Sequence, residues 1–257
     1  SGMRILRIIT IVLAGLSLVA RAGTPQQAAA VRTGYERANE AWQLKLKLAK
    51  SDAERQSLMS QSPDRLAVAE KIWSVIKGDL DKEWILDPGA WFLRLAFPLA
   101  KIGEDGIPRP MMAEQVEAVR REVGQYHIKS SKLAPMCMAL VACGDNQAMN
   151  LLRKIEKENP DKTVRGVAAL GIAMLDKNLG DDARDRSERL SMLRKAIIDA
   201  SDGVIDGSSV AKMAEDELYI IMNLSKGRVA PDLIGVDSGG RPMKLSDFSG
   251  KVVMLLF

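Results

Sequence analysis

Cysteine and histidine are scarce in this chain, and the scarcity limits the chemistry it can perform. Its 257 residues include two cysteines and one histidine, His127. A single histidine gives little basis for a Ser-His-Asp triad or a histidine-based metal site. We expect a structural role for His127 at the surface or in a hydrogen bond. With no glycine-rich phosphate loop and no G-x-S-x-G motif either, we predict no catalytic, cofactor-binding or metal-ligating residue.

The two cysteines, Cys137 and Cys143, are six residues apart in an apolar run. On a helix this spacing turns the side chains by about 240° and separates them by about 9 Å along the axis, so a disulfide between them would require unwinding. The spacing matches neither C-x-x-C nor a zinc knuckle. We expect two buried, unpaired thiols.

Aromatic residues are also few, at 4% of the chain, although 47% of it is hydrophobic. The hydrophobic residues are largely alanine, leucine and methionine, which lose little side-chain freedom in a helix. The composition therefore predicts a mainly α protein, and the length allows one or two domains.

The net charge of +4 comes mostly from the N-terminus, where residues 1–22 hold three arginines and no acidic residue. The rest of the chain has 34 Lys and Arg against 33 Asp and Glu. So small an excess does not indicate a surface for nucleic acid or anionic lipid. We expect no nucleic-acid partner.

The first 22 residues have the pattern of a secretory signal peptide. Residues 1–2 are interpreted as a cloning scar; basic residues follow Met3, residues 8–19 are apolar, and Ala20-Arg21-Ala22 supplies an A-x-A cleavage site. The apolar run is too short to span a bilayer. We expect cleavage after Ala22, a periplasmic or secreted protein, and no membrane attachment after cleavage; the alternative is an uncleaved N-terminal anchor.

Helical periodicity continues through residues 23–226, which we predict to form an α-helical domain of stacked antiparallel helices. Glycines and prolines predict a loop at Lys101–Pro110. The helices are expected from Pro25 to about Lys50, after Pro63, as short bent helices in Leu80–Ala100, at Asn146–Glu158, at Thr163–Asn178, after a cap at Ser187, and after a cap at Ser208 or Ser209.

Two groups of side chains in this region allow a functional interpretation beside a structural one. The acidic run at residues 181–185 could hold calcium, but it lacks the fixed glycine and terminal glutamate of an EF-hand, so a solvated linker is favoured. Four aromatic residues could line a ligand groove, although aromatics at helical spacing usually belong to the core. They are Trp73, Trp84, Trp91 and Phe92.

A faint internal repeat appears when residues 152–154 are aligned with residues 193–195, since both segments read Leu-Arg-Lys. The offset of 41 residues is the size of a HEAT-like or TPR-like helical pair, which would stack into a curved solenoid. Ordinary helix composition also produces such matches, and both interpretations stay open.

The pattern changes near residues 225–227, and we place a domain boundary there. Leu233–Val236 is a strand candidate, Ser238–Gly240 a turn, and Pro242–Leu245 a second strand, followed by the apolar run Val252–Phe257. The tail is thus predicted to form a hairpin followed by a buried strand.

The tail resembles the start of the redoxin family, the thioredoxin-fold group that contains exported thiol:disulfide oxidoreductases and thiol peroxidases of the alkyl hydroperoxide reductase kind. Residues 159–175 also look like the helical region that precedes the redoxin domain in one subgroup. The residues carrying the resemblance are Ala230-Pro231-Asp232, Asp237-Ser238-Gly239-Gly240, Leu245-Ser246-Asp247-Phe248 and Gly250-Lys251-Val252-Val253.

The resemblance implies that residues 227–257 are the first part of a thioredoxin-like domain. Family members continue into a W-x-x-x-C-x-x-C segment whose first cysteine is the nucleophile, whereas this sequence ends at Phe257. No catalytic residue can be carried over. We expect an exported protein of the redoxin lineage that is inactive as given, able to self-associate through its C-terminal strand; the alternative is a helical interaction module of the cell envelope with a protein partner.

Overall fold

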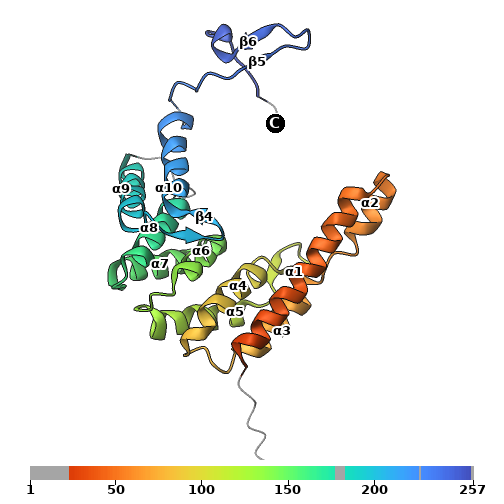
Figure 1. The fold of residues 1–257 in the computed structure, drawn as a ribbon, viewed down its shortest axis with the longest axis vertical. Coiled ribbons are helices and arrows are strands. Elements are labelled where there is room, and N and C mark those ends of the chain that lie inside the picture. The colour runs from red at the N-terminus through yellow and green to blue at the C-terminus, as the bar shows by residue number, and fades with distance from the viewer. Residues whose placement is uncertain (1–22, 177–182, 226, 256–257) are drawn as a thin grey trace, which may run out of the picture.

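The computed structural model describes residues 23–176, 183–225 and 227–255. The expected signal peptide, and Asp181 and Asp182 of the acidic run, lie outside these ranges. The described chain is mainly helical, which confirms the predicted fold class, and its strands form small two-stranded sheets. The helices follow a curved path from α1 and α2 at one end to α10 at the other (Figure 1).

Helix α1 (Pro25–Leu48) begins where the sequence predicts. Thr24 caps it, since the Thr24 hydroxyl accepts a hydrogen bond from Gln27 N and the Gln27 side chain accepts one from Thr24 N. The polar stretch that follows contains a helix that the periodicity does not reveal, α2 (Asp52–Met59). Trp42 of α1 donates its indole N–H to the carbonyl of Leu58, at 2.7 Å, and so holds α2 against α1.

The next helices are α3 (Arg65–Ile76) and α4 (Leu86–Ala96), with the 3-10 turn η1 (Glu83–Ile85) between them. The predicted loop at 101–110 is wrong. It is an antiparallel hairpin of β1 (Ala100–Ile102) and β2 (Pro108–Pro110). Pro108 and Pro110 are tolerated in β2 because both strands of a two-stranded sheet are edge strands. On an edge strand, a proline can sit where its missing N–H would face solvent and not a neighbouring strand.

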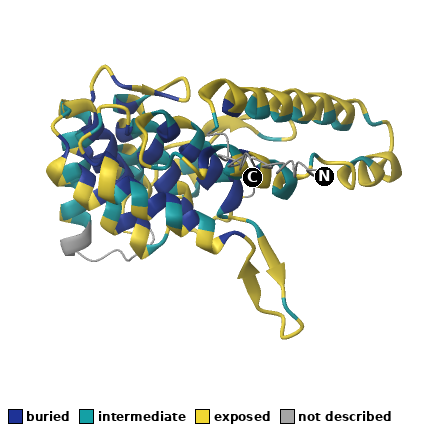
Figure 2. Ribbon diagram, turned by 90° about the horizontal axis from the view of Figure 1, so that it is seen from below, coloured by how far each residue is buried: buried dark blue, intermediate teal, exposed yellow. Residues whose placement is uncertain are grey.

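The central helices are α5 (Ala113–Glu122), α6 (Ala134–Cys143), α7 (Asn146–Glu158) and α8 (Lys162–Asp176), and a π-helical turn, η2 (Val123–His127), ends α5. The predicted bounds of α7 are confirmed. Helix α8 is buried nearly all round, as expected, because α6, α7 and α9 pack against it. Figure 2 shows the buried residues gathered in this body and α1 and α2 mostly exposed. The residues of the tail are also mostly exposed.

The last helices are α9 (Ala183–Asp199) and α10 (Val210–Tyr219), followed by the π-helical turn η3 (Ile220–Leu224). The predicted cap at Ser187 is wrong, because α9 has already begun four residues earlier. Ser209 does cap α10, accepting a hydrogen bond from Lys212 N at 3.3 Å. Between α9 and α10 the chain forms a short hairpin of β3 (Val204–Ile205) and β4 (Ser208–Ser209).

The tail forms the predicted hairpin from β5 (Ile234–Val236) and β6 (Pro242–Lys244), followed by a short 3-10 turn, η4 (Leu245–Phe248). The strand expected from Val252 is not formed within the described residues: Val252–Leu255 has no regular structure and is exposed. A central strand needs hydrogen-bonded neighbours, and none of the described segments pairs with this one.

Candidate functional site

The two thiols are buried and unpaired, as the sequence predicts. Cys137 and Cys143 lie in α6, both buried and both free. Burial raises the pKa of the Cys137 thiol to about 12. Burial also raises the pKa of Cys143, although the nearby Arg120 guanidinium acts in the opposite direction. The reactive form of cysteine is the thiolate, which these pKa shifts suppress.

His127 is likewise structural. It is buried at the end of η2, and its Nε2 atom lies 2.8 Å from the carbonyl oxygen of Leu80. This contact joins the turn after α5 to the segment before α4.

The four aromatic residues divide into two pairs. Trp73 and Phe92 pack together with ring centroids 5.6 Å apart, and Phe92 is fully buried, so this pair belongs to the core as expected. Trp84 and Trp91 are only partly buried and line a surface groove. Trp84 and Trp91 are therefore not simply core residues, although the sequence favoured a core role for all four aromatic residues.

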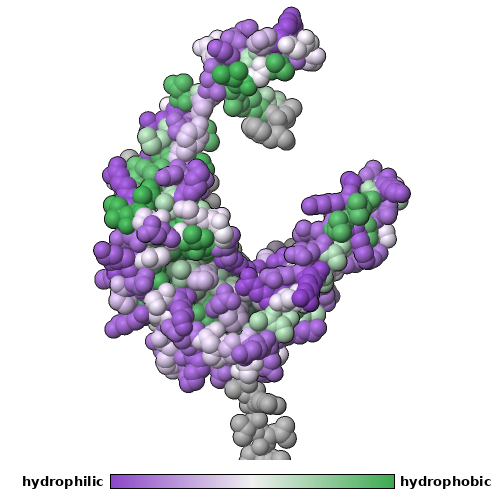
Figure 3. All heavy atoms as spheres, viewed as in Figure 1, coloured by the Kyte–Doolittle hydropathy of each residue, from purple (hydrophilic) through white to green (hydrophobic). Residues whose placement is uncertain are grey.

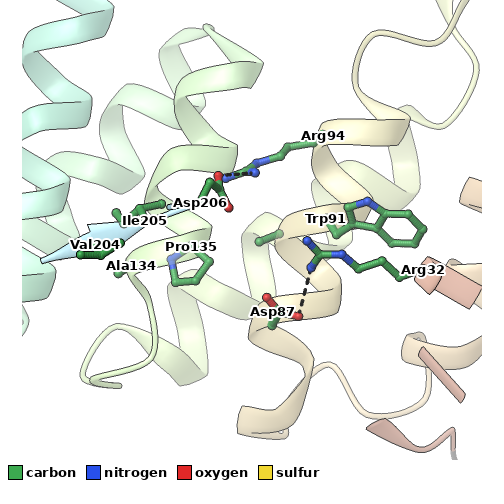
Figure 4. Close-up of a pocket in the computed structure, with 10 residues that line it drawn as sticks. Arg32, Asp87, Trp91, Arg94, Ala134, Pro135, Val204, Ile205 and Asp206 are labelled. Carbon is green, nitrogen blue, oxygen red and sulfur yellow. Dashed lines mark hydrogen bonds and ion pairs between the residues drawn. The ribbon is translucent and has the colours of Figure 1, made fainter. Parts of the chain in front are cut away.

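We call this feature the α1–α4 groove. It consists of two adjoining cavities, of about 480 and 140 Å³, which share Arg32, Asp87 and Trp91. The larger is also lined by Trp84 and Pro88. Figure 4 shows the smaller cavity, where the β3–β4 hairpin approaches α4.

Ion pairs fix the positively charged side chains of the groove. Arg32 Nε lies 2.8 Å from Glu36 Oε1, and Arg32 Nη1 lies 3.5 Å from Asp87 Oδ2. The hydrogen bond to Glu36 is the main reason that the pKa of Arg32 is raised. The Arg32 Cζ atom is 5.9 Å from the centroid of the Trp91 ring, a cation–π distance.

Asp206 connects the turn of the β3–β4 hairpin with α4. Its carboxylate lies 2.7 Å from Arg94 Nη1, a contact between residues 112 positions apart. Asp206 has a φ of 51°, and Gly207 follows it in the turn. Asp-Gly is a strong hairpin signal in the sequence, but this signal does not identify Arg94 as the partner of Asp206.

A second cavity, of about 340 Å³, lies between the end of α4, β2, and the N-terminal ends of α5 and α7; we call it the Arg120 pocket. Arg120 of α5 is only 6% exposed and forms part of its wall. The sequence gives no signal that Arg120 is buried, because an arginine on an amphipathic helix is ordinarily solvated.

The described residues contain no cluster of three or more His, Cys, Asp or Glu side chains arranged to hold a metal ion. Nor is any helix in the described ranges long and apolar enough to cross a membrane.

No protein-family model matches this chain, and neither the curated proteins nor the solved structures include a match.

Proposed function

We propose that this chain is the docking part of an exported protein of the redoxin lineage, in which the helical residues 23–226 bind a partner protein through the α1–α4 groove. The observation that carries the proposal is the composition of the groove, where Trp84 and Trp91 lie beside Arg32 and Arg94. Tryptophan and arginine are the residues most enriched among those that dominate binding energy at protein interfaces.

The groove also favours one kind of occupant, an extended peptide segment with an acidic side chain next to an apolar one. The apolar side chain would cover Trp91, which is partly exposed. The acidic one would join Arg32, whose contact with Asp87 at 3.5 Å is longer than a good charge-assisted hydrogen bond.

The redoxin part of the proposal is supported by the tail. Its β5–β6 hairpin lies within the segment that carries the resemblance, and Asp232 accepts hydrogen bonds from the backbone N–H and the hydroxyl of Ser246 after the second strand. Large apolar side chains are exposed on the tail and also on α9 and η3 (Figure 3). We infer that the tail completes its sheet with further strands, in a longer chain or in a second copy.

The docking function is tested by selecting peptides from a random library on the purified chain and measuring their affinity by fluorescence anisotropy. We expect selected peptides to carry an acidic residue beside an apolar one. Trp91→Ala should weaken their binding by about tenfold, a typical loss for an interface tryptophan. Trp42→Ala is the matched control, since Trp42 lies on α1 outside the groove, and it should leave the affinity unchanged.

Equal binding to the two variants would contradict the groove as the docking site. A parallel disulfide-reduction assay tests the alternative of catalysis, and we expect only background turnover from the chain. Turnover well above background that disappears in Cys137→Ala or Cys143→Ala would instead make those thiols the functional site.

A further inference from the structure

The hydrogen bonds of the β1–β2 hairpin show which of its backbone groups point outward. Met111 N donates to Leu99 O at 2.9 Å, and Gly103 N donates to Ile107 O at 3.0 Å. In an antiparallel pair, residues that bond across the ladder alternate with residues whose N–H and C=O groups point away from the partner strand. In this register, positions 101 and 109 therefore bond across the ladder, whereas positions 100, 102, 108 and 110 face outward.

The two edges of the hairpin differ in what they offer to another strand. Both outward positions of β2 are prolines, Pro108 and Pro110, which have no N–H to donate, so this edge is blocked. The outward positions of β1 are Ala100 and Ile102, each with an N–H and a C=O group. All three residues of β1 are exposed, and β2 is the one described strand that pairs with it. The hairpin thus has a single open edge, along β1.

The side chains of β1 present different chemistry on its two faces. Ala100 and Ile102 lie on one face, and Ile102 is 70% exposed. Lys101 lies on the other face and forms no ion pair within the described ranges. Arg109, directly across the ladder from Lys101, is already paired with Asp105 at 2.6 Å. The open edge therefore combines two apolar positions with one unpaired positive charge.

This pattern disfavours a second copy of the chain as the occupant of the edge. If two copies paired antiparallel through β1, Ala100 of one would bond with Ile102 of the other, and the two Lys101 side chains would lie opposite each other. Like charges directly opposite each other destabilise a strand pair, whereas opposite charges stabilise it. The charge of Lys101 thus favours a strand with an acidic residue at that position.

We propose that β1 binds an extended segment of a partner protein as a third, antiparallel strand, with an acidic residue opposite Lys101 and apolar residues opposite Ala100 and Ile102. In this mode of recognition the backbone hydrogen bonds supply affinity and the alternate side chains supply specificity. The α1–α4 groove shares no lining residue with β1, so the inference does not rest on the proposed function.

The test uses a synthetic peptide of about nine residues, a common strand length, in which valine alternates with threonine and glutamate replaces the central threonine. Hydrogen exchange followed by NMR on the full chain reads binding at single amides. We expect the peptide to slow exchange at Ala100 and Ile102 but not at Lys101, whose amide is already bonded across the hairpin. Trp91→Ala should respond in the same way, which separates this site from the docking groove.

Two modified peptides test the backbone pairing. Methylating the amide nitrogens of the two valines beside the glutamate removes the donors that face β1, and we expect binding to weaken by about tenfold, as for the loss of one to two hydrogen bonds. Methylating the glutamate nitrogen, which points away from β1, should leave binding unchanged. The proposal is overturned if the valine-methylated peptide binds as tightly as the parent, or if the parent does not bind at millimolar concentration.

Variants of the chain test the same contact from the other side. Ile102→Pro removes an outward donor without breaking the hairpin ladder, so it should weaken peptide binding by about tenfold at an unchanged melting temperature, whereas the control Ile102→Val should bind normally. Lys101→Glu should reverse the preference, binding a peptide with a central lysine better than the glutamate peptide. Equal binding by Ile102→Pro and Ile102→Val would overturn the proposal. So would slowed exchange at Ala100 and Ile102 that rises with chain concentration without peptide, since the occupant would then be a second copy.

Discussion

Cys137 lies in α6, which packs against α4 and α8, and its side chain is fully buried. Arg120 is nearly as buried but retains two unpaired donors on its guanidinium. A thiol tolerates an apolar environment by staying protonated, whereas a guanidinium remains charged and requires acceptors. The same degree of burial therefore leaves the thiol protonated, whereas the guanidinium depends on Asp145 and Gln147 as acceptors.

Because the pKa of Cys137 is raised by burial, we expect the protein to lose stability at alkaline pH. The unfolded thiol loses its proton near its ordinary pKa of 9.0, while the folded thiol keeps it to about 12. The folded state thus binds more protons between these values, so the free energy of unfolding falls as pH rises from about 9 to 12 and is unaffected below 9. One such proton contributes a slope of about 1.4 kcal/mol per pH unit.

Lysines and tyrosines also lose protons in this alkaline range. Comparing the wild-type chain with Cys137→Ala isolates the contribution of the Cys137 thiol to the free energy of unfolding. Urea unfolding of both proteins from pH 8 to pH 11 should show the steeper loss in the wild-type chain. Identical slopes would mean that the thiol is more accessible to water than its burial indicates.

At the scale of the elements, close packing between α8 and α9 depends on a residue without a side chain. A Cβ atom added at Gly166 would lie 2.6 Å from the Cβ of Ala200 and 2.8 Å from its backbone nitrogen. These distances are too short for any real contact, and backbone atoms cannot move aside cheaply. Gly166 therefore sets how near the two helices approach.

We expect Gly166→Ala to destabilise the protein by about 1–3 kcal/mol, the usual effect of overpacking, even though alanine is the better helix former. The matched control is Gly34→Ala in α1, where an added Cβ meets nothing within 4 Å. That change should stabilise by up to about 1 kcal/mol. Thermal and urea unfolding measure both effects, and stabilisation by both substitutions would show that α8 and α9 separate more readily than their packing implies.

At the scale of the whole molecule, the chain divides into a packed helical body and a tail that extends from it (Figure 1). The tail hairpin pairs with itself, and its apolar residues Ile234, Val236 and Val252 are exposed. The segment before the hairpin is open to solvent, with Val229 93% exposed. The tail therefore contributes little to the stability of the helical body.

Limited trypsin treatment should cleave first after Arg228 and leave a helical body whose melting temperature equals that of the intact chain. Exposed connecting segments are the preferred sites of proteolysis, whereas the arginines within packed helices resist it. Sedimentation should show concentration-dependent association of the intact chain and not of the cleaved body, since the apolar tail residues would be gone. Early cuts within α5–α8, or a lower melting temperature after cleavage, would contradict this division.

The sequence by itself determined the helical class, the start of α1 at Pro25, the bounds of α7, a cap for α10 at Ser208 or Ser209, the unpaired thiols and the tail hairpin. These features depend on neighbours within a few residues, through periodicity, capping and turn chemistry. The tertiary structure alone decided that Trp91 lines a groove while Phe92 is core, that Asp206 reaches Arg94, and that Arg120 is buried with unpaired donors. Each of these depends on which distant segments pack together, and local pattern carries no information about that. The tail shows the same limit, because the apolar run from Val252 has strand character but becomes a strand only when another segment supplies its hydrogen bonds.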